Sequence, residues 1–186
     1  MLVTMKLSKR LSIMVFRMQL PSKTMKGGTS MAISRFFIMD RVDAIQYCKE
    51  HHKEKTAVIS INTSWERPAR IVKTQENGVL DVLWLFFDDV TGGPNSFNEE
   101  HAENIIRFID SWRDLVDILL VHCDAGVSRS AAVCAAVKRY LGFDDMDIFN
   151  SKKYDPNHLV YTTIREITVG EEYTPKLDEE RFMVND

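Results

Sequence analysis

The sequence predicts an α/β fold in which helices flank a central, mostly parallel sheet of four to five strands. Short apolar runs rich in branched residues alternate along the chain with segments of helical periodicity. The 186 residues are 45% apolar and 27% charged, which is enough material for one sizeable core. No internal repeat, long linker or apolar run of bilayer length divides the chain, so we expect one soluble domain.

The first half of this domain supplies three strands and one helix. Residues 33–39 predict a strand, residues 41–52 a helix and residues 56–61 a second strand. The third strand covers the apolar run 79–87 and follows a turn at Asn77-Gly78.

The second half begins with a helix over residues 98–112. Its apolar side chains recur at helical spacing, and we expect them in the core: Ala102, Ile105, Ile106, Phe108, Ile109 and Trp112. A buried strand follows at 117–121 and a helix at 130–141. One or two further helices complete the domain, the last of them around residues 159–167.

The loop between the strand 117–121 and the helix 130–141 carries the residues with chemical potential. Cys123 and Arg129 are separated by five loop residues, so both can face one concavity. Backbone N–H groups of such a loop and of the first helical turn point their positive ends into it, which attracts anions. Gly126 permits a tight turn, and the Arg129 guanidinium can bond two phosphate oxygens at once. In this field a Cys123 thiol ionises readily to the nucleophilic thiolate.

A buried structural cysteine is the ordinary alternative for Cys123, since it follows an apolar strand. The spacing of His122, Cys123, Gly126, Arg129 and Ser130 on a strand-loop-helix corner favours a phosphate site instead.

The stretch from His122 to Ser130, here called the signature loop, resembles the loop of the cysteine-dependent protein tyrosine phosphatases. Its Ala125-Gly126 pair, Ser128 and the Ala-rich helix that follows are most similar to the dual-specificity branch. The resemblance implies a protein tyrosine phosphatase-like fold, attack of Cys123 on phosphorus and help from Ser130 when the thiolate leaves. It also implies that His122 tunes Cys123 and that the phosphate is bound by residues Asp124, Ala125, Gly126, Val127, Ser128 and Arg129.

Such a mechanism needs a carboxylic acid to protonate the leaving oxygen. The apolar strand 79–87 leads directly into Asp88-Asp89 and a turn-rich segment. In the resembled family the second position of such a pair is usually the acid, so Asp89 is the expected general acid and Asp88 the alternative. Either aspartate can instead serve turn chemistry alone.

Pro156-Asn157 opens the last helix, as a similar pair does in the resembled family. By that resemblance Asn157 supports the signature loop. A simple helix cap is an equally good interpretation, and the two roles are compatible.

The charge is uneven along the chain. Residues 1–30 contain six Lys or Arg and no Asp or Glu, whereas the remaining 156 residues hold 18 basic against 27 acidic side chains, a net charge of −9. An acidic body disfavours nucleic acid as a partner. Members of the resembled family that act on polyphosphate or inositol-lipid substrates tend to carry lysines in the loop; this loop has none, so the resemblance disfavours such substrates. An inward carboxylate of Asp124 would repel phosphate, so we expect that side chain to point outward, toward substrate or a nearby cation.

The basic segment 1–30 is interpreted as an extension that is not necessarily part of the native domain; a secretory signal and an organelle leader are weaker alternatives. The catalytic domain is expected over 31–170, with an acidic tail over 171–186. Three cysteines without paired spacing fit a reducing, cytoplasmic location and no disulfide or metal site. No cofactor and no membrane partner is expected, and the sequence does not predict an oligomeric state.

Three functions are compatible with these residues. The first is a phosphatase for phosphotyrosine, and also phosphoserine and phosphothreonine, in phosphorylated proteins. The second is a catalytically silent phosphate-binding module, although no essential residue is missing. The third is a phosphatase for a small metabolite or an RNA 5′-phosphate. No aromatic phosphotyrosine-clamping segment is recognisable before Asp88.

Overall fold

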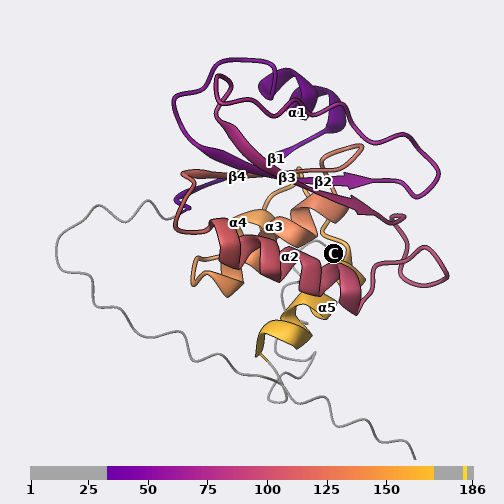
Figure 1. The fold of residues 1–186 in the computed structure, drawn as a ribbon. Coiled ribbons are helices and arrows are strands. Elements are labelled where there is room, and N and C mark those ends of the chain that lie inside the picture. The colour runs from indigo at the N-terminus through magenta and orange to yellow at the C-terminus, as the bar shows by residue number, and fades with distance from the viewer. Residues whose placement is uncertain (1–32, 170–181, 184–186) are drawn as a thin grey trace, which may run out of the picture.

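The computed structural model describes residues 33–169 and 182–183 (Figure 1). The expectations for residues 1–30, and for the tail apart from Phe182 and Met183, lie outside these residues. The elements are β1 (Arg35–Met39), α1 (Arg41–Tyr47), β2 (Thr56–Asn62), β3 (Val79–Phe86), α2 (Glu99–Trp112), β4 (Ile118–His122), α3 (Arg129–Tyr140), α4 (Met146–Phe149) and α5 (His158–Val169).

Four strands form one sheet in the order β1-β4-β2-β3, and every neighbouring pair is parallel. The central strands β2 and β4 are buried along their whole length. Strand β4 is apolar up to His122, and β2 is apolar except for Thr56, Ser60 and Asn62, as expected for strands covered on two faces. The expected α/β class with a parallel sheet of four to five strands is confirmed, with four strands in the described part of the chain.

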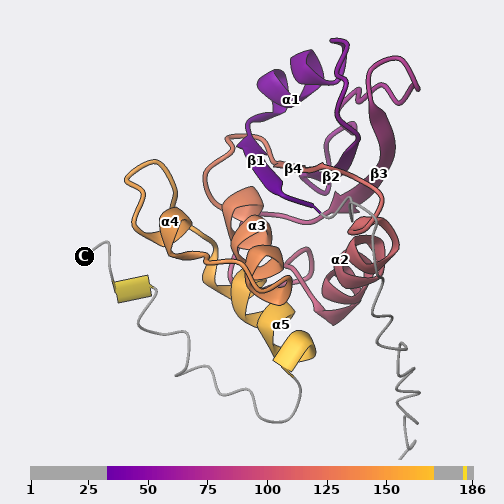
Figure 2. The ribbon, with the colours of Figure 1, turned by 90° about the vertical axis from the view of Figure 1, so that its left-hand side faces the viewer.

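Helices cover the sheet on both faces. Helix α1 lies on one face, and α2, α3, α4 and α5 lie on the other (Figures 1 and 2). Side chains of β2 alternate accordingly: Ile59 packs in the large core beneath the four helices, whereas Val58 packs with Ala44 under α1. The sheet is therefore held between two hydrophobic cores, and its strand ends are fixed in place.

Helix boundaries agree with the expected ones to within about two residues except at the first helix. That helix was expected over 41–52, but it ends at Tyr47. The His52 ring stacks on the Tyr47 ring with centroids 3.8 Å apart, and its Nε2 lies 2.8 Å from the Tyr47 carbonyl oxygen. These contacts turn the chain back where helical periodicity alone would continue it.

Helix α2 begins with a reciprocal cap. The Asn98 side chain accepts from the His101 N–H, and His101 Nδ1 accepts from the Asn98 N–H. Of the six side chains expected in the core, Ala102, Ile105 and Ile109 are buried and the other three, Ile106, Phe108 and Trp112, are partly buried against them.

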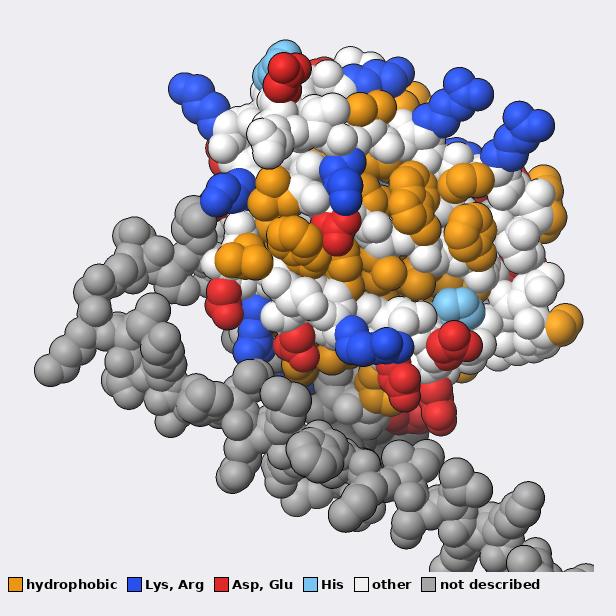
Figure 3. Space-filling view, in the orientation of Figure 1, with side chains coloured by type: hydrophobic (Ala, Val, Ile, Leu, Met, Phe, Trp, Pro, Cys, Tyr) orange, Lys and Arg blue, Asp and Glu red, His pale blue; other side chains and the backbone are white. Residues whose placement is uncertain are grey.

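Strand β3 forms one edge of the sheet and exposes apolar side chains there. Trp84 and Phe86 are 37% and 41% exposed, and the space-filling view shows hydrophobic side chains gathered over this edge and α2 (Figure 3). Near the C-terminal end of the sequence, the Phe182 ring packs against the rings of Phe149 and Tyr161. Among the described residues, no helix has the length and apolar character required to cross a bilayer.

Candidate active site

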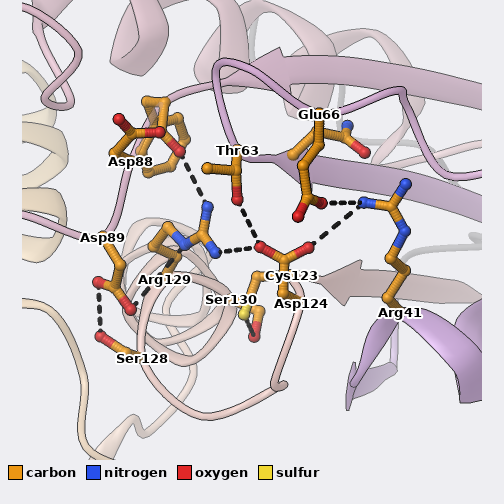
Figure 4. A network of polar contacts seen from close by, with 12 residues as sticks. Arg41, Thr63, Glu66, Asp88, Asp89, Cys123, Asp124, Ser128, Arg129 and Ser130 are labelled. Carbon is orange, nitrogen blue, oxygen red and sulfur yellow. Dashed lines mark hydrogen bonds and ion pairs between the residues drawn. The ribbon is translucent and has the colours of Figure 1, made fainter.

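All four strands end at the same edge of the sheet because they are parallel. The segment after each strand contributes one part of the site: Arg41 after β1, Thr63 after β2, residues 87–89 after β3 and the signature loop after β4 (Figure 4). This is the edge at which open parallel sheets bind ligands.

Cys123 lies at the base of the signature loop and is 2% exposed. The Gly126 N–H donates to its Sγ at 3.3 Å, and the Ser130 Oγ lies 3.2 Å from the same sulfur. Two polar groups therefore face the sulfur within hydrogen-bond distance. The structure brings Ser130 to Cys123 as the sequence analysis expected.

The signature loop is held from outside through its carbonyl groups. The N–H groups of Arg41, Asp155 and Asn157 donate to the carbonyls of Asp124, Val127 and Ser128 respectively, at 3.2, 3.2 and 3.5 Å. A peptide carbonyl and the N–H that follows it point in opposite directions. Because these three carbonyls bond residues outside the loop, the N–H groups that follow them point into the loop. The loop thus offers the N–H groups of Ala125, Ser128 and Arg129 to an anion, while Val127 contributes its carbonyl to the bond from Asp155.

Gly126 adopts φ of 69°, which L-residues with a side chain rarely adopt. A Cβ at this position would lie 2.6 Å from the Asp40 nitrogen and 2.6 Å from the Met39 carbonyl carbon. Both the backbone conformation and the close approach to the end of β1 require glycine.

His122 is fully buried at the end of β4. Its Nε2 lies 2.8 Å from the Ser60 Oγ, and its Nδ1 lies 3.4 Å from the Cys123 carbonyl oxygen. Burial lowers the pKa of His122 to about 4, so the ring is neutral at physiological pH. Its link to Cys123 runs through the backbone; a tuning role stays a prediction.

Arg129 is buried at the start of α3 with its guanidinium in the site. Nη1 donates to the Phe87 carbonyl oxygen at 2.9 Å, and Nη2 donates to Asp124 Oδ2 at 2.6 Å. Nε has no hydrogen-bond partner among the described residues; Asp89 Oδ2 lies 3.9 Å from it.

The Asp124 carboxylate contacts two cationic side chains, which was one expectation for it. One of them is Arg41, and the other is Arg129 itself. The expectation that this carboxylate turns away from the phosphate-binding groups is therefore wrong. Asp124 Oδ2 also accepts from the Thr63 hydroxyl at 2.6 Å, and Oδ1 pairs with Arg41 at 3.3 Å. Burial alone would raise the pKa of Asp124, but the bonds from Thr63 and Arg129 outweigh it and hold that pKa below its usual value.

Asp89 faces the signature loop. Its Oδ1 accepts from the Ser128 hydroxyl at 2.9 Å and from Asn157 Nδ2 at 2.8 Å (Figure 4 shows the Ser128 contact). The structure thus brings together the expected acid and the phosphate-binding loop.

Asp88 faces the other way, toward the turn at residues 63–66. Its Oδ1 accepts from the N–H and the hydroxyl of Ser64, at 3.0 and 2.9 Å, and its Oδ2 accepts from Asn95 Nδ2 at 3.3 Å. The Ser64 bonds hold the pKa of Asp88 below its usual value. Asp88 is thus occupied in holding two neighbouring loops, a structural role that differs from the local turn bond expected as its alternative.

Both interpretations of Asn157 hold in the geometry. Its Oδ1 accepts from the Val160 N–H at 3.2 Å, which caps α5. Its Nδ2 donates to Asp89, and its N–H bonds the Ser128 carbonyl. The residue therefore joins α5, the acid segment and the signature loop.

Sequence reasoning missed several residues at this edge, above all Arg41, Thr63 and Ser60. Each is a polar residue at or just beyond the carboxyl end of a predicted strand, which is the pattern that could have indicated them. Trp65 was missed as well. It is 77% exposed, and its neighbours Ser64 and Glu66 are bonded to Asp88 and Arg41.

The other two cysteines pack in the core. Cys134 lies on α3 beneath the sheet, and Cys48 lies under the opposite face. Burial raises the pKa of each thiol to about 12. Within the ranges that the structure describes, no three His, Cys, Asp or Glu side chains gather so that they could hold a metal ion.

No family model matches the chain, and no curated protein matches it by sequence. Solved structures do match. The human tyrosine phosphatase-like serine/threonine/tyrosine-interacting protein aligns with a TM-score of 0.51 at 22% identity, over 72% of this chain and 91% of that one. Human DUSP28 aligns with a TM-score of 0.51 at 20% identity, over the same shares. The chain therefore has the fold of the dual-specificity, tyrosine phosphatase-like proteins, as its signature loop predicted.

Proposed function

From this fold and the geometry of the signature loop, we propose that the protein is a phosphatase that hydrolyses phosphate monoesters through a phosphocysteine intermediate. The observation that carries the proposal is the placement of Cys123 Sγ next to the Gly126 N–H, beside a buried Arg129 whose Nε has no hydrogen-bond partner among the described residues. A phosphate monoester supplies the oxygens that these donors bind.

In the first step the Cys123 thiolate attacks phosphorus, and the bond from phosphorus to the leaving oxygen breaks. Asp89 gives its proton to that oxygen. Asp89 suits this role better than Asp88, because the bonds from Ser64 direct the Asp88 carboxylate away from the loop whereas Asp89 faces it.

In the second step a water molecule attacks the phosphorus of the phosphocysteine, and Asp89 takes a proton from that water. The bond from phosphorus to sulfur breaks. The Ser130 hydroxyl, 3.2 Å from Sγ, donates a hydrogen bond to the departing thiolate. The products are inorganic phosphate and the regenerated Cys123 thiolate, so atoms and charge balance without an additional reactant.

The proposed substrates are phosphotyrosine, and also phosphoserine and phosphothreonine, in proteins. Support for an aromatic leaving group comes from Trp65, whose indole is exposed on a turn that Ser64 and Glu66 fix to the site. A stacking contact with a substrate ring contributes about 0.5–1.5 kcal/mol, or roughly two- to tenfold in kcat/KM.

Turnover of a chromogenic aryl phosphate under reducing conditions tests the proposal. We expect the wild-type protein and the control Cys134→Ser to hydrolyse it and Cys123→Ser to be inactive. No turnover by the wild-type protein would leave the phosphate-binding module as the better reading. Comparison of phosphotyrosine and phosphoserine peptides with a 5′-phosphorylated RNA then ranks the substrate classes. Trp65→Ala should reduce only the preference for phosphotyrosine.

A further inference from the structure

The carboxylate of Asp124 joins two arginines at the rim of the signature loop. Oδ2 accepts from Arg129 Nη2 at 2.6 Å and Oδ1 pairs with Arg41 Nη1 at 3.3 Å (Figure 4). Thr63 adds a hydroxyl bond to Oδ2 at 2.6 Å. Arg41 is held in turn by Glu66 at 3.1 Å and by the Arg67 carbonyl. Each charged side chain in this network, from Arg129 through Asp124 and Arg41 to Glu66, thus has a neighbour of opposite sign.

The donors of Arg129 divide into two sets. A guanidinium carries five N–H groups in one plane. The Phe87 carbonyl takes one from Nη1 and Asp124 takes one from Nη2, so both terminal nitrogens are fixed. The Nε–H is buried without a hydrogen-bond partner among the described residues, and each terminal nitrogen keeps a second hydrogen. Asp89 Oδ2 faces this edge from 3.9 Å, beyond hydrogen-bond distance, so an oxyanion can bind Nε while Asp124 keeps its bond.

The charge of Asp124 would weaken phosphate binding if it stood alone beside the loop. Arg41 offsets it, because the Arg41 side chain is three-quarters buried and pairs with both Asp124 and Glu66. Arg41 begins α1, and its N–H also bonds the Asp124 carbonyl. The start of α1 thus fixes both the backbone and the side chain of Asp124, the residue that follows the nucleophile.

We propose that Asp124 and Arg41 are positioning residues: they hold the Arg129 guanidinium in the plane in which its Nε edge meets a phosphoryl group. This inference rests on the proposed function, since it assigns Arg129 to phosphate. Asp124 itself does not contact the substrate in this arrangement. The loop gains a preorganised arginine that loses little conformational freedom when phosphate binds.

Binding of inorganic phosphate, measured by calorimetry on the full chain, tests the proposal without any need for turnover. We expect Asp124→Asn and Arg41→Met to weaken phosphate binding about tenfold or more, because a misplaced arginine loses charge-assisted bonds. Arg41→Lys, which keeps the cation, should recover part of the affinity. Asp114→Asn removes one charge from a carboxylate that is 71% exposed and should bind as the wild type does.

Kinetics with an aryl phosphate separate positioning from folding. In Asp124→Asn we expect KM to rise and kcat to fall together, in a protein that remains folded at the assay temperature. Tighter phosphate binding in Asp124→Asn or Arg41→Met would overturn the proposal, because Asp124 would then compete with phosphate for Arg129. Unchanged binding in both variants would also overturn it. Absence of phosphate binding by the wild-type protein would instead contradict the phosphate loop itself.

Discussion

The two adjacent aspartates after β3 receive different roles from their hydrogen-bond partners. Asp89 is bonded to Ser128 and Asn157 at the signature loop, whereas Asp88 is bonded to Ser64 on the neighbouring turn. Sequence alone placed both at the end of a strand and preferred Asp89 by family resemblance. Apart from Asn95 beside Asp88, the partners that direct these side chains lie 24 to 68 residues away, which no local pattern contains.

Substitution of each aspartate distinguishes these roles. Asp89→Asn should lower kcat about 10²- to 10⁴-fold, as loss of a general acid does, while Asp88→Asn should lower it less than about tenfold. The Asp89→Asn defect should shrink with a phosphate ester whose leaving group needs no proton. Steady-state kinetics with two esters of different leaving-group basicity give the answer. A larger loss in Asp88→Asn would reassign the acid.

At the scale of elements, the strand-loop-helix corner was predictable from sequence because its signals are local. An apolar strand, a glycine-containing loop and an Ala-rich helix follow one another within residues 117–141. The contacts of Asp124 with Arg129, Arg41 and Thr63 were not predictable, because they depend on the strand order. The observed order β1-β4-β2-β3 puts β4 between β1 and β2, and so places the residues after β1 and β2 on either side of the loop after β4.

The signature loop should tolerate no side chain at Gly126. Gly126→Ala forces a Cβ within 2.6 Å of Asp40 and Met39 in addition to the cost of positive φ. Gly142 provides a matched control, since it has φ of 84° but nothing within 4 Å of an added Cβ. We expect Gly142→Ala to cost about 1–2 kcal/mol and Gly126→Ala more, with loss of phosphate binding only in Gly126→Ala. Chemical denaturation measures the difference; equal costs would show that the close approach is relieved.

At the scale of the whole molecule, the buried imidazole of His122 links stability to pH. Its folded pKa of about 4 lies below the ordinary value of 6.5, so the unfolded chain binds the proton more readily. The contribution of neutral His122 to the free energy of unfolding is therefore fully present above about pH 6.5. It is lost as the pH drops toward 4, by about 3 kcal/mol in total.

Unfolding free energies at pH 7.5 and pH 4.5 test this linkage. The wild-type protein and a His51→Gln control, which changes an exposed histidine, should both lose about 2–3 kcal/mol from the His122 contribution. His122→Gln should lose correspondingly less between the two pH values. The same pH dependence in all three proteins would contradict a buried neutral imidazole.

The central claim is that Cys123 carries the phosphoryl group during turnover. A rapid denaturing quench during turnover of an aryl phosphate, followed by peptide mass spectrometry, tests it most directly. Ser130→Ala is the variant of choice, because loss of the hydroxyl 3.2 Å from Sγ should slow breakdown of the intermediate. We predict one phosphoryl group on Cys123, at higher occupancy in Ser130→Ala than in the wild-type protein. Continued turnover by Cys123→Ser, or a phosphoryl group on another residue, would contradict the account.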